Sequence, residues 1–260
     1  MSPSERVVVV DRLVAAGCVA ADEEAEELLG TAPDAATLEA WLRRREDGEP
    51  LAWITGSLRF CGRALHVVPG VYVPRIQSEE LARRAAAVLP PEGRAVDLCT
   101  GAGAVAAHLA AQAPAATVIG TDIDIRAAAC ARRNGVRAVV ADLDRPLGGG
   151  RFDVVTAVAP YVPTGEMRLL PRDVQRHEPR AALDGGEDGL DLVRRVVGAA
   201  ARLLRGGGWL LVEVGGAQDE ALRPTLSTAG FGRAEAWWDE DGELRGLAAR
   251  APTGPGPPRR

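Results

Sequence analysis

The chain has 260 residues, of which 47% are hydrophobic, and it carries a formal net charge of −5. This length suits one large domain, or one medium domain with a small one attached, and the apolar content suffices for a packed core. The negative charge excludes a general electrostatic attraction to nucleic acid, so we expect no direct nucleic-acid partner. All 31 basic residues are arginine, which excludes Schiff-base chemistry on a lysine.

The cysteines and the apolar runs indicate a cytoplasmic protein. Cys18, Cys61, Cys99 and Cys130 lie far apart and form no Cys-x-x-Cys pair, which argues against a zinc site or a disulfide framework. The N-terminus lacks the basic start and apolar stretch of a signal peptide, and no apolar run is long enough to span a membrane. We therefore expect no metal site, no membrane partner and a cytoplasmic location.

Residues 1–50 predict a small helical domain, with helical periodicity in 21–29 and 34–45. Residues 51–77 predict a linker that carries a β-hairpin within 58–68. We expect the helical domain to select the molecule on which the protein acts.

From residue 78 to 251 strands and helices alternate, which predicts a parallel sheet with helices on both faces. Strands are expected at 94–98, 117–121, 137–141, 152–157 and 208–214, and helices at 79–88 (capped by Ser78), 103–112, 125–133, 188–204 and 217–229. Two last strands, within 230–238 and 243–250, predict an antiparallel hairpin at the sheet edge. The result is a Rossmann-like α/β fold with a mostly parallel, seven-stranded sheet, followed by a disordered tail at 252–260.

A glycine turn follows the first of these parallel strands. Gly101 and Gly103 permit a tight turn, which brings the backbone close to a ligand at the start of a helix. Taken alone, the spacing Gly101-x-Gly103-x-x-Ala106 also fits a dinucleotide site.

Three acidic residues at successive strand ends favour a different ligand. Asp97, at the end of the first strand, can meet a cationic amine but would repel a diphosphate. Asp122, at the end of the second, can accept hydrogen bonds from two ribose hydroxyls. Asp142, at the end of the third, can accept from the exocyclic amine of adenine. This set predicts S-adenosylmethionine, a nucleoside without phosphate that carries an amino-acid end, and hence a methyltransferase of class I fold. An oxidoreductase that binds NAD is a weaker alternative.

Several segments resemble the HemK/PrmC family, whose members methylate the side-chain nitrogen of a glutamine in peptide chain release factors. The resemblance rests on Gly48-Glu-Pro-Leu-Ala-Trp-Ile-Thr-Gly56, Val73-Pro-Arg75, the turn from Asp97 to Gly103, and the stretch from Glu178 to Asp191. It is strongest for an actinobacterial subgroup whose acceptor loop reads Asn-Ala-Pro-Tyr-Val-Pro. A release factor, or another protein, is the partner that this resemblance implies.

The same resemblance implies the site residues. Those expected to bind the cofactor are Asp97, Cys99, Thr100, Gly101, Ala102, Gly103, Asp122, Asp142, Leu143 and Val158. Those expected to bind the acceptor are Val158, Ala159, Pro160 and Tyr161, of which the last three are expected to be catalytic. For three residues alternatives stay open: Arg75 braces the linker against the cofactor site or is an exposed arginine, His177 forms hydrogen bonds in its loop or acts as a base, and Glu213 is structural or lines the pocket, without a firm role.

The family's acceptor loop reads Asn-Pro-Pro-Tyr, and this chain departs from it at two positions, since Ala159 also replaces the first proline. Val158 stands where the family has an asparagine, and valine accepts no hydrogen bond. In the family this asparagine and the next backbone carbonyl aim the weakly nucleophilic amide nitrogen at the methyl group. Loss of one positioned polar partner costs about 10²–10³ in rate. Three alternatives stay open: glutamine methylation, methylation of a small molecule or another acceptor, and cofactor binding with impaired catalysis.

Overall fold

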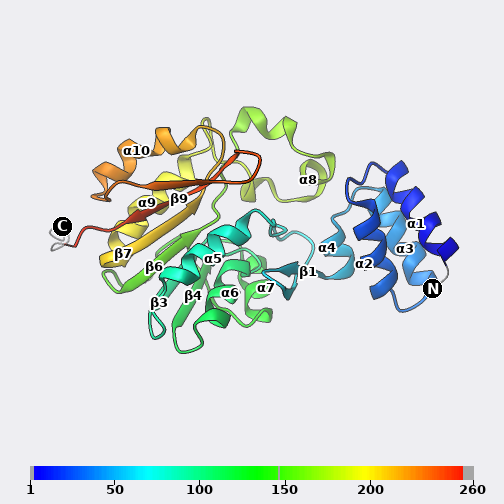
Figure 1. Cartoon of the computed structure of the whole chain (residues 1–260), viewed down its shortest axis with the longest axis horizontal. Coiled ribbons are helices and arrows are strands. Elements are labelled where there is room, and N and C mark those ends of the chain that lie inside the picture. Colours follow the sequence, from blue (N-terminus) through cyan, green and yellow to red (C-terminus); the bar gives the residue numbers. More distant parts are fainter. Residues whose placement is uncertain (1–2, 146, 254–260) are drawn as a thin grey trace.

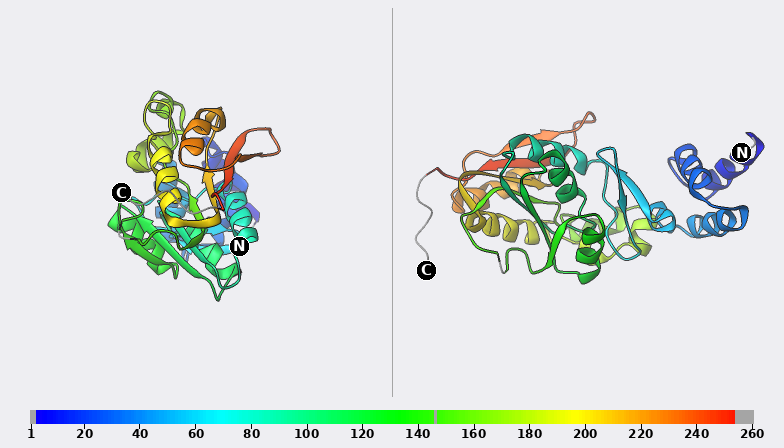
Figure 2. Two further views of the ribbon diagram at one scale, coloured as in Figure 1. Left: turned by 90° about the vertical axis from the view of Figure 1, so that its left-hand side faces the viewer. Right: turned by 90° about the horizontal axis from the view of Figure 1, so that it is seen from below.

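A computed structural model describes residues 3–145 and 147–253, and it begins with a helical module that projects from one end of the molecule (Figure 1 and Figure 2). The module consists of α1 (Pro3–Ala15), α2 (Ala21–Thr31), α3 (Ala35–Glu46) and the short α4 (Leu51–Thr55). One apolar side chain from each helix is buried at its centre: Leu13, Leu28, Leu42 and Ile54. The predicted helical region is confirmed, and α4, which was expected to be linker, completes its core.

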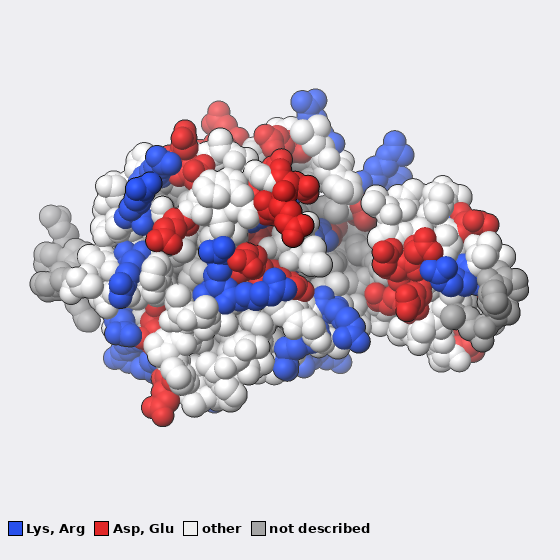
Figure 3. Space-filling view, in the orientation of Figure 1, with Lys and Arg blue, Asp and Glu red and all other residues white. Residues whose placement is uncertain are grey.

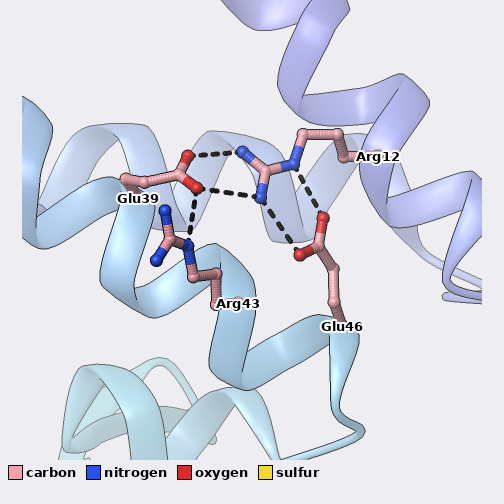
Figure 4. Close-up of polar contacts among 4 residues, drawn as sticks. All are labelled: Arg12, Glu39, Arg43 and Glu46. Carbon is pink, nitrogen blue, oxygen red and sulfur yellow. Dashed lines mark hydrogen bonds and ion pairs between the residues drawn. The ribbon is translucent and has the colours of Figure 1, made fainter.

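Arg12 ties α1 to α3 through the network of charged side chains drawn in Figure 4. Its Nη1 lies 2.6 Å from Oε2 of Glu39 and its Nε lies 2.7 Å from Oε1 of Glu46, while Nε of Arg43 lies 2.9 Å from Oε1 of Glu39. Hydrogen bonds from Arg12 hold the pKa values of both carboxyl groups below their usual range. Solvent screens these exposed carboxylates, so the network orients the helices more than it stabilises the fold.

Acidic side chains gather on one face of the module, whereas both signs of charge mix over the rest of the molecule in the same view (Figure 3). Part of this acidity is balanced within the module. Asp22 of α2 pairs with Arg6 at 2.6 Å, and Glu24 pairs with Arg45 of α3 at the same distance.

A β-hairpin connects the module to the sheet domain. Its strands are β1 (Ser57–Phe60) and β2 (Arg63–His66), paired antiparallel, which confirms the predicted hairpin. The turn between them places Gly62 at φ +74°, a backbone conformation that glycine adopts without strain.

The sheet has seven strands in the order β5-β4-β3-β6-β7-β9-β8. The strands are β3 (Arg94–Leu98), β4 (Thr117–Asp122), β5 (Arg137–Val140), β6 (Phe152–Ala157), β7 (Leu204–Glu213), β8 (Glu235–Trp238) and β9 (Leu244–Arg250). The first five are parallel, and β9 and β8 form the antiparallel edge. The predicted fold class is therefore confirmed. Every parallel strand ends at the same edge, which is where such folds bind their ligands.

Two layers of helices cover the sheet (Figure 1). The buried residues of α5 (Ser78–Val88), α6 (Ala104–Gln112) and α7 (Ile125–Arg133) pack on one face. Those of α9 (Asp191–Leu203) and α10 (Gln218–Thr228) pack on the other. The prediction that Ser78 caps α5 is wrong: Ser78 is the first residue of the helix, and its side chain is buried.

Three further predicted boundaries are corrected. β7 begins at Leu204 rather than at residue 208, because Leu204 pairs with Phe152; the pairing with β6 resumes at Trp209, opposite Val154, after a register shift. The helix expected from residue 188 begins at Asp191, because Gly189, at φ +77°, fits against the backbone of Tyr161. β8 occupies only four residues of the segment 230–238.

The long connection from β6 to α9 holds three short helices that the sequence did not predict. They are the 3₁₀ helix η1 (Thr164–Leu169), α8 (Arg172–His177) and the 3₁₀ helix η2 (Arg180–Ala182). Of the tail expected to be disordered, residues 254–260 lie outside the described part. Within the described ranges, no helix combines the length and the apolar character needed to cross a membrane.

Candidate active site

The glycine turn leaves β3 at the carboxyl edge of the sheet and leads into α6. Cys99, Gly101 and Gly103 all have positive φ, at +56°, +56° and +83°. Cys99 therefore adopts a conformation that glycine fits better, which agrees with the glycine usual at this position in the resembling family. A Cβ on Gly101 would meet no atom within 4 Å, whereas a Cβ on Gly103 would lie 2.9 Å from the side chains of Ala131 and Val136. Gly103 thus brings α6 against α7, and Gly101 faces open space.

Gly103→Ala is expected to lower the free energy of unfolding by about 1–3 kcal/mol, because it combines overpacking against α7 with a left-handed backbone. Gly101→Ala is the matched control, since it carries only the backbone cost of about 1 kcal/mol. Urea unfolding measures both. Equal losses in the two variants would contradict the close packing of Gly103.

Asp97 is buried beneath this turn, with 2% of its surface exposed. Its Oδ2 accepts a hydrogen bond from Thr100 Oγ1 at 2.6 Å, and its Oδ1 accepts one from Thr156 Oγ1 at 2.7 Å. Burial disfavours the charged form and raises the pKa of Asp97 to about 6, although both hydroxyls act against this shift. The group borders a cavity of about 30 Å³ that Thr100, Ala102 and Val158 also line. The two hydroxyl groups that donate to Asp97 are neutral, so its carboxylate can still pair with a cation that enters this cavity.

Asp122 lies on the other side of the turn. The backbone N–H of Gly101 donates to its Oδ2 at 2.9 Å, and that of Asp124 donates to its Oδ1 at 2.9 Å. Burial raises the pKa of this carboxyl as well. Asp122 lines a cavity of about 180 Å³ between the ends of β3, β4 and β5. The two backbone donors fix the orientation of the carboxylate toward a ligand there.

Asp142 and Leu143 line the same cavity. Both oxygens of Asp142 contact Nη2 of Arg195, at 2.6 and 2.8 Å. Leu143 packs into the core with φ +53°, which directs the chain away after Asp142. A ligand amine at Asp142 would therefore share this carboxylate with a guanidinium.

A third cavity, of about 360 Å³, lies beside the acceptor loop and is lined by Val158, Ala159, Pro160 and Tyr161. Val158 and Tyr72 border all three of these cavities. The side chain of Ala159 is buried in the core, so only its backbone is suited to a polar contact. The cofactor cavity and the acceptor cavity thus meet at Val158 and Tyr72.

Arg75 lines one side of the acceptor cavity and pairs with Glu178 behind it. Glu178 is buried, pairs with Arg75 and accepts from the backbone N–H of Val73 at 3.2 Å. The Arg75 guanidinium lies 5.0 Å from the centroid of the Tyr72 ring. Arg75 thereby holds the linker, and with it Tyr72, against the loop that follows α8.

Most of the predicted site residues come together at these cavities. Cys99, Gly101, Asp122, Asp142, Leu143 and Val158 line the larger cofactor cavity, and Asp97, Thr100 and Ala102 line the smaller one. Gly103 borders neither. Sequence reasoning missed Tyr72, Ile123 and Arg195, which also line these spaces. Val71-Tyr-Val-Pro-Arg75 was noticed only as linker, and no local signal marks Arg195 as the partner of Asp142.

Comparison with known proteins agrees with this geometry. A family model described as "Methyltransferase domain" matches residues 95–177. A release factor glutamine methyltransferase of Geobacter sulfurreducens is 41% identical over 72% of this chain and 68% of its own length. One of Cereibacter sphaeroides is 35% identical over 94% of this chain and 96% of its own length.

Two further matches concern the acceptor and the fold. A 4-amino-L-phenylalanine/4-methylamino-L-phenylalanine methyltransferase of Streptomyces pristinaespiralis is 40% identical over 68% of this chain and 65% of its own length. The solved E. cuniculi Mtq2–Trm112 complex, described as responsible for methylation of the eRF1 translation termination factor, contains a chain with 22% identity and a TM-score of 0.54. That match covers 70% of this chain and 99% of that one, and it shows a shared fold.

Proposed function

The chain belongs to the release factor glutamine methyltransferase family, and on this basis we propose that it methylates the side-chain nitrogen of a glutamine in a peptide chain release factor, with S-adenosylmethionine as the donor. One observation carries the proposal: the acid-lined cavities at the glycine turn meet the acceptor cavity at Val158 and Tyr72. We place the reaction in the cytoplasm, where release factors work.

The carboxylates fit the donor. Asp97 is a buried anion at the edge of a cavity, as an ammonium group requires. Asp122 is held by two backbone N–H groups and keeps lone pairs for ribose hydroxyls. Asp142 and Leu143 border the far part of the same cavity, where an adenine ring would lie. S-adenosylmethionine, when bound, supplies a methyl group on a cationic sulfur. This assignment replaces the NAD alternative.

The acceptor loop positions the nucleophile. The backbone carbonyl of Ala159 can accept one N–H of the glutamine amide, and Pro160 and Tyr161 shape the wall of the cavity. Positioning is the main contribution available to such a site, because an amide nitrogen is a weak nucleophile. The helical module, residues 1–50, would recognise the rest of the release factor.

Mass spectrometry of a release factor after incubation tests the function. The peptide that contains the glutamine should gain the mass of one methylene group, about 14 Da. A family member that has the asparagine serves as the positive control. If that enzyme modifies the release factor and this one does not, the proposed acceptor is wrong.

Val158 favours a second candidate, a small aromatic amine. The nitrogen of an arylamine is more nucleophilic than that of an amide and depends less on two hydrogen-bond acceptors. The Streptomyces relative is named for such a substrate. Incubation with 4-amino-L-phenylalanine, followed by chromatography, distinguishes this candidate. Donor binding without transfer to either acceptor would indicate impaired catalysis.

Binding of the donor is expected to weaken about tenfold between pH 7 and pH 5, because Asp97, with a pKa of about 6, attracts an ammonium only when ionised. The stability of the protein without donor should instead increase as the pH falls. Folded Asp97 holds its proton more tightly than the unfolded chain does, so its stabilising contribution is complete below about pH 3.9 and is lost as the pH rises through 6. Calorimetry and urea unfolding across this range measure the two effects. A flat affinity profile would contradict the role of Asp97.

A further inference from the structure

Glu213 ends β7 beside the acceptor loop. Ala157 of β6 pairs with Val212 of β7, so Val158, just beyond its strand, lies at the level of Glu213, which still pairs with Gly246 of β9. Side chains alternate between the faces of a sheet, and Val212 packs on the α9 side. Glu213 therefore points to the α5 side, where Leu211 and Val158 also pack. The carboxylate lies next to the position at which the family's asparagine is missing.

The environment of Glu213 is unusual for a carboxylate. It is 2% exposed, and its Oε2 has no hydrogen-bond partner among the described residues. The hydroxyls of Ser78 and Tyr161 lie close enough to favour its charged form, but Oε2 and the Ser78 hydroxyl fall short of hydrogen-bond geometry. An acceptor buried in this way costs free energy, which indicates that the group serves a purpose other than stability.

The backbone and the ring of Tyr161 are both held by neighbouring segments. Nε2 of Gln218 donates to its backbone carbonyl at 2.8 Å. A Cβ on Gly215 would lie 3.6 Å from its ring, and a Cβ on Gly189 would lie 2.2 Å from its carbonyl oxygen. Burial raises the pKa of its hydroxyl, and the negative charge of Glu213 acts in the same direction, which places this carboxylate near the hydroxyl. Glu213 itself borders none of the three cavities, so any effect on the acceptor passes through Tyr161.

We propose that Glu213 is a positioning residue of the methyl-transfer site, which accepts the hydroxyl proton of Tyr161 in a hydrogen bond and so fixes the ring that forms the wall of the acceptor cavity. The choice of acceptor in this proposal rests on the function proposed above. The contact between Glu213 and Tyr161 does not depend on that function. Tyr161 would thus take over part of the positioning that Val158 cannot provide.

A spectroscopic test uses a property of the composition. The chain has two tyrosines, Tyr72 and Tyr161. Protein labelled with 3-fluorotyrosine should give two fluorine resonances, which Tyr161→Phe assigns. The Tyr161 resonance should move with pH at a midpoint above about 4.3, the ordinary pKa of glutamate, because burial raises the pKa of Glu213. This movement should vanish in Glu213→Gln and persist in Glu235→Gln, a control on the exposed start of β8.

The comparison of wild type with Glu213→Gln also accounts for the other charged groups near Glu213. Arg75 of the linker and Arg245 of β9 favour its charged form, and Tyr72 lies at longer range. Both arginines are present in wild type and in Glu213→Gln alike, so they cancel when the two proteins are compared. A Tyr161 resonance that responds to pH identically in wild type and Glu213→Gln would overturn the proposal.

Kinetics give the second test. Glu213→Gln and Tyr161→Phe should each lower kcat about tenfold, measured with the acceptor that the wild-type protein methylates. The double variant should show the same reduction in kcat as either single variant. Donor affinity, measured by calorimetry, should stay within about twofold. Additive losses, or an equal loss of donor affinity, would show a merely structural role and overturn the proposal. If wild type transfers no methyl group, the proposed function fails while the fluorine experiment still decides the contact.

Discussion

The Asp97→Asn variant is expected to bind S-adenosylmethionine about 100-fold more weakly than the wild-type protein, since loss of one partner from a buried charge pair costs about 2–5 kcal/mol. Asparagine has the same shape, and its carbonyl oxygen still accepts a hydrogen bond from Thr100 or Thr156. The substitution removes the charge and turns the second acceptor oxygen into an NH2 donor, from which the other threonine hydroxyl can accept. Methyl transfer should fall at least in parallel, and calorimetry measures the affinity directly.

The stability of Asp97→Asn separates this effect from misfolding. Burial opposes the charge on Asp97, so at neutral pH the neutral variant should be at least as stable as wild type. Asp11→Asn, on the exposed side of α1, is the control for loss of one negative charge. An affinity within about threefold of wild type would show that another group holds the amine.

The Val158→Asn variant is expected to methylate the release-factor glutamine about 10²-fold faster than wild type, because it restores a hydrogen-bond acceptor for the amide nitrogen. The exchange is close in volume, and Val158 lies at the junction of the cavities with part of its surface exposed. The amide of the introduced asparagine can therefore reach the acceptor without a large rearrangement of the core. Initial rates at saturating donor measure the gain.

Val140→Asn provides the control for this substitution. Val140 lies on the edge strand β5 and is 43% exposed, so its replacement should leave the rate unchanged. A wild-type enzyme that already works as fast as its asparagine-bearing relatives, with no gain in Val158→Asn, would show that valine suffices at this position. A gain in glutamine methylation from an inactive wild type would indicate that the native acceptor is a different molecule.

The sequence predicts strands β3 to β6 well, including β5 at the partly exposed edge of the sheet. Between residues 94 and 157, apolar runs alternate with short amphipathic helices, and each observed boundary lies within one residue of its prediction. The three acids follow from the same pattern, because parallel strands end at one edge. A strand was expected only from residue 208, but Leu204 pairs with Phe152, 52 positions earlier in the chain, and β7 therefore begins at Leu204.

The rest of the site depends on contacts between distant segments. Arg75 meets Glu178 across 103 positions, and Arg195 meets Asp142 across 53. Neither pair has a spacing that a helix or strand period would mark. Tyr72 has no acidic or glycine signal beside it, yet it borders all three cavities, since the linker folds back over the sheet edge.

The short helix α8 lies between the acceptor cavity and the helical module. One side of it contributes Asp173 and Val174 to the acceptor cavity. On the same face of this helix, His177 meets the Trp53 ring edge-on at 6.4 Å, and Trp53 Nε1 donates a 3.0 Å hydrogen bond to the carbonyl oxygen of Val71. One short helix therefore contacts both the wall of the acceptor cavity and a tryptophan of the helical module, so the shape of the cavity and the position of the module depend on the same six residues.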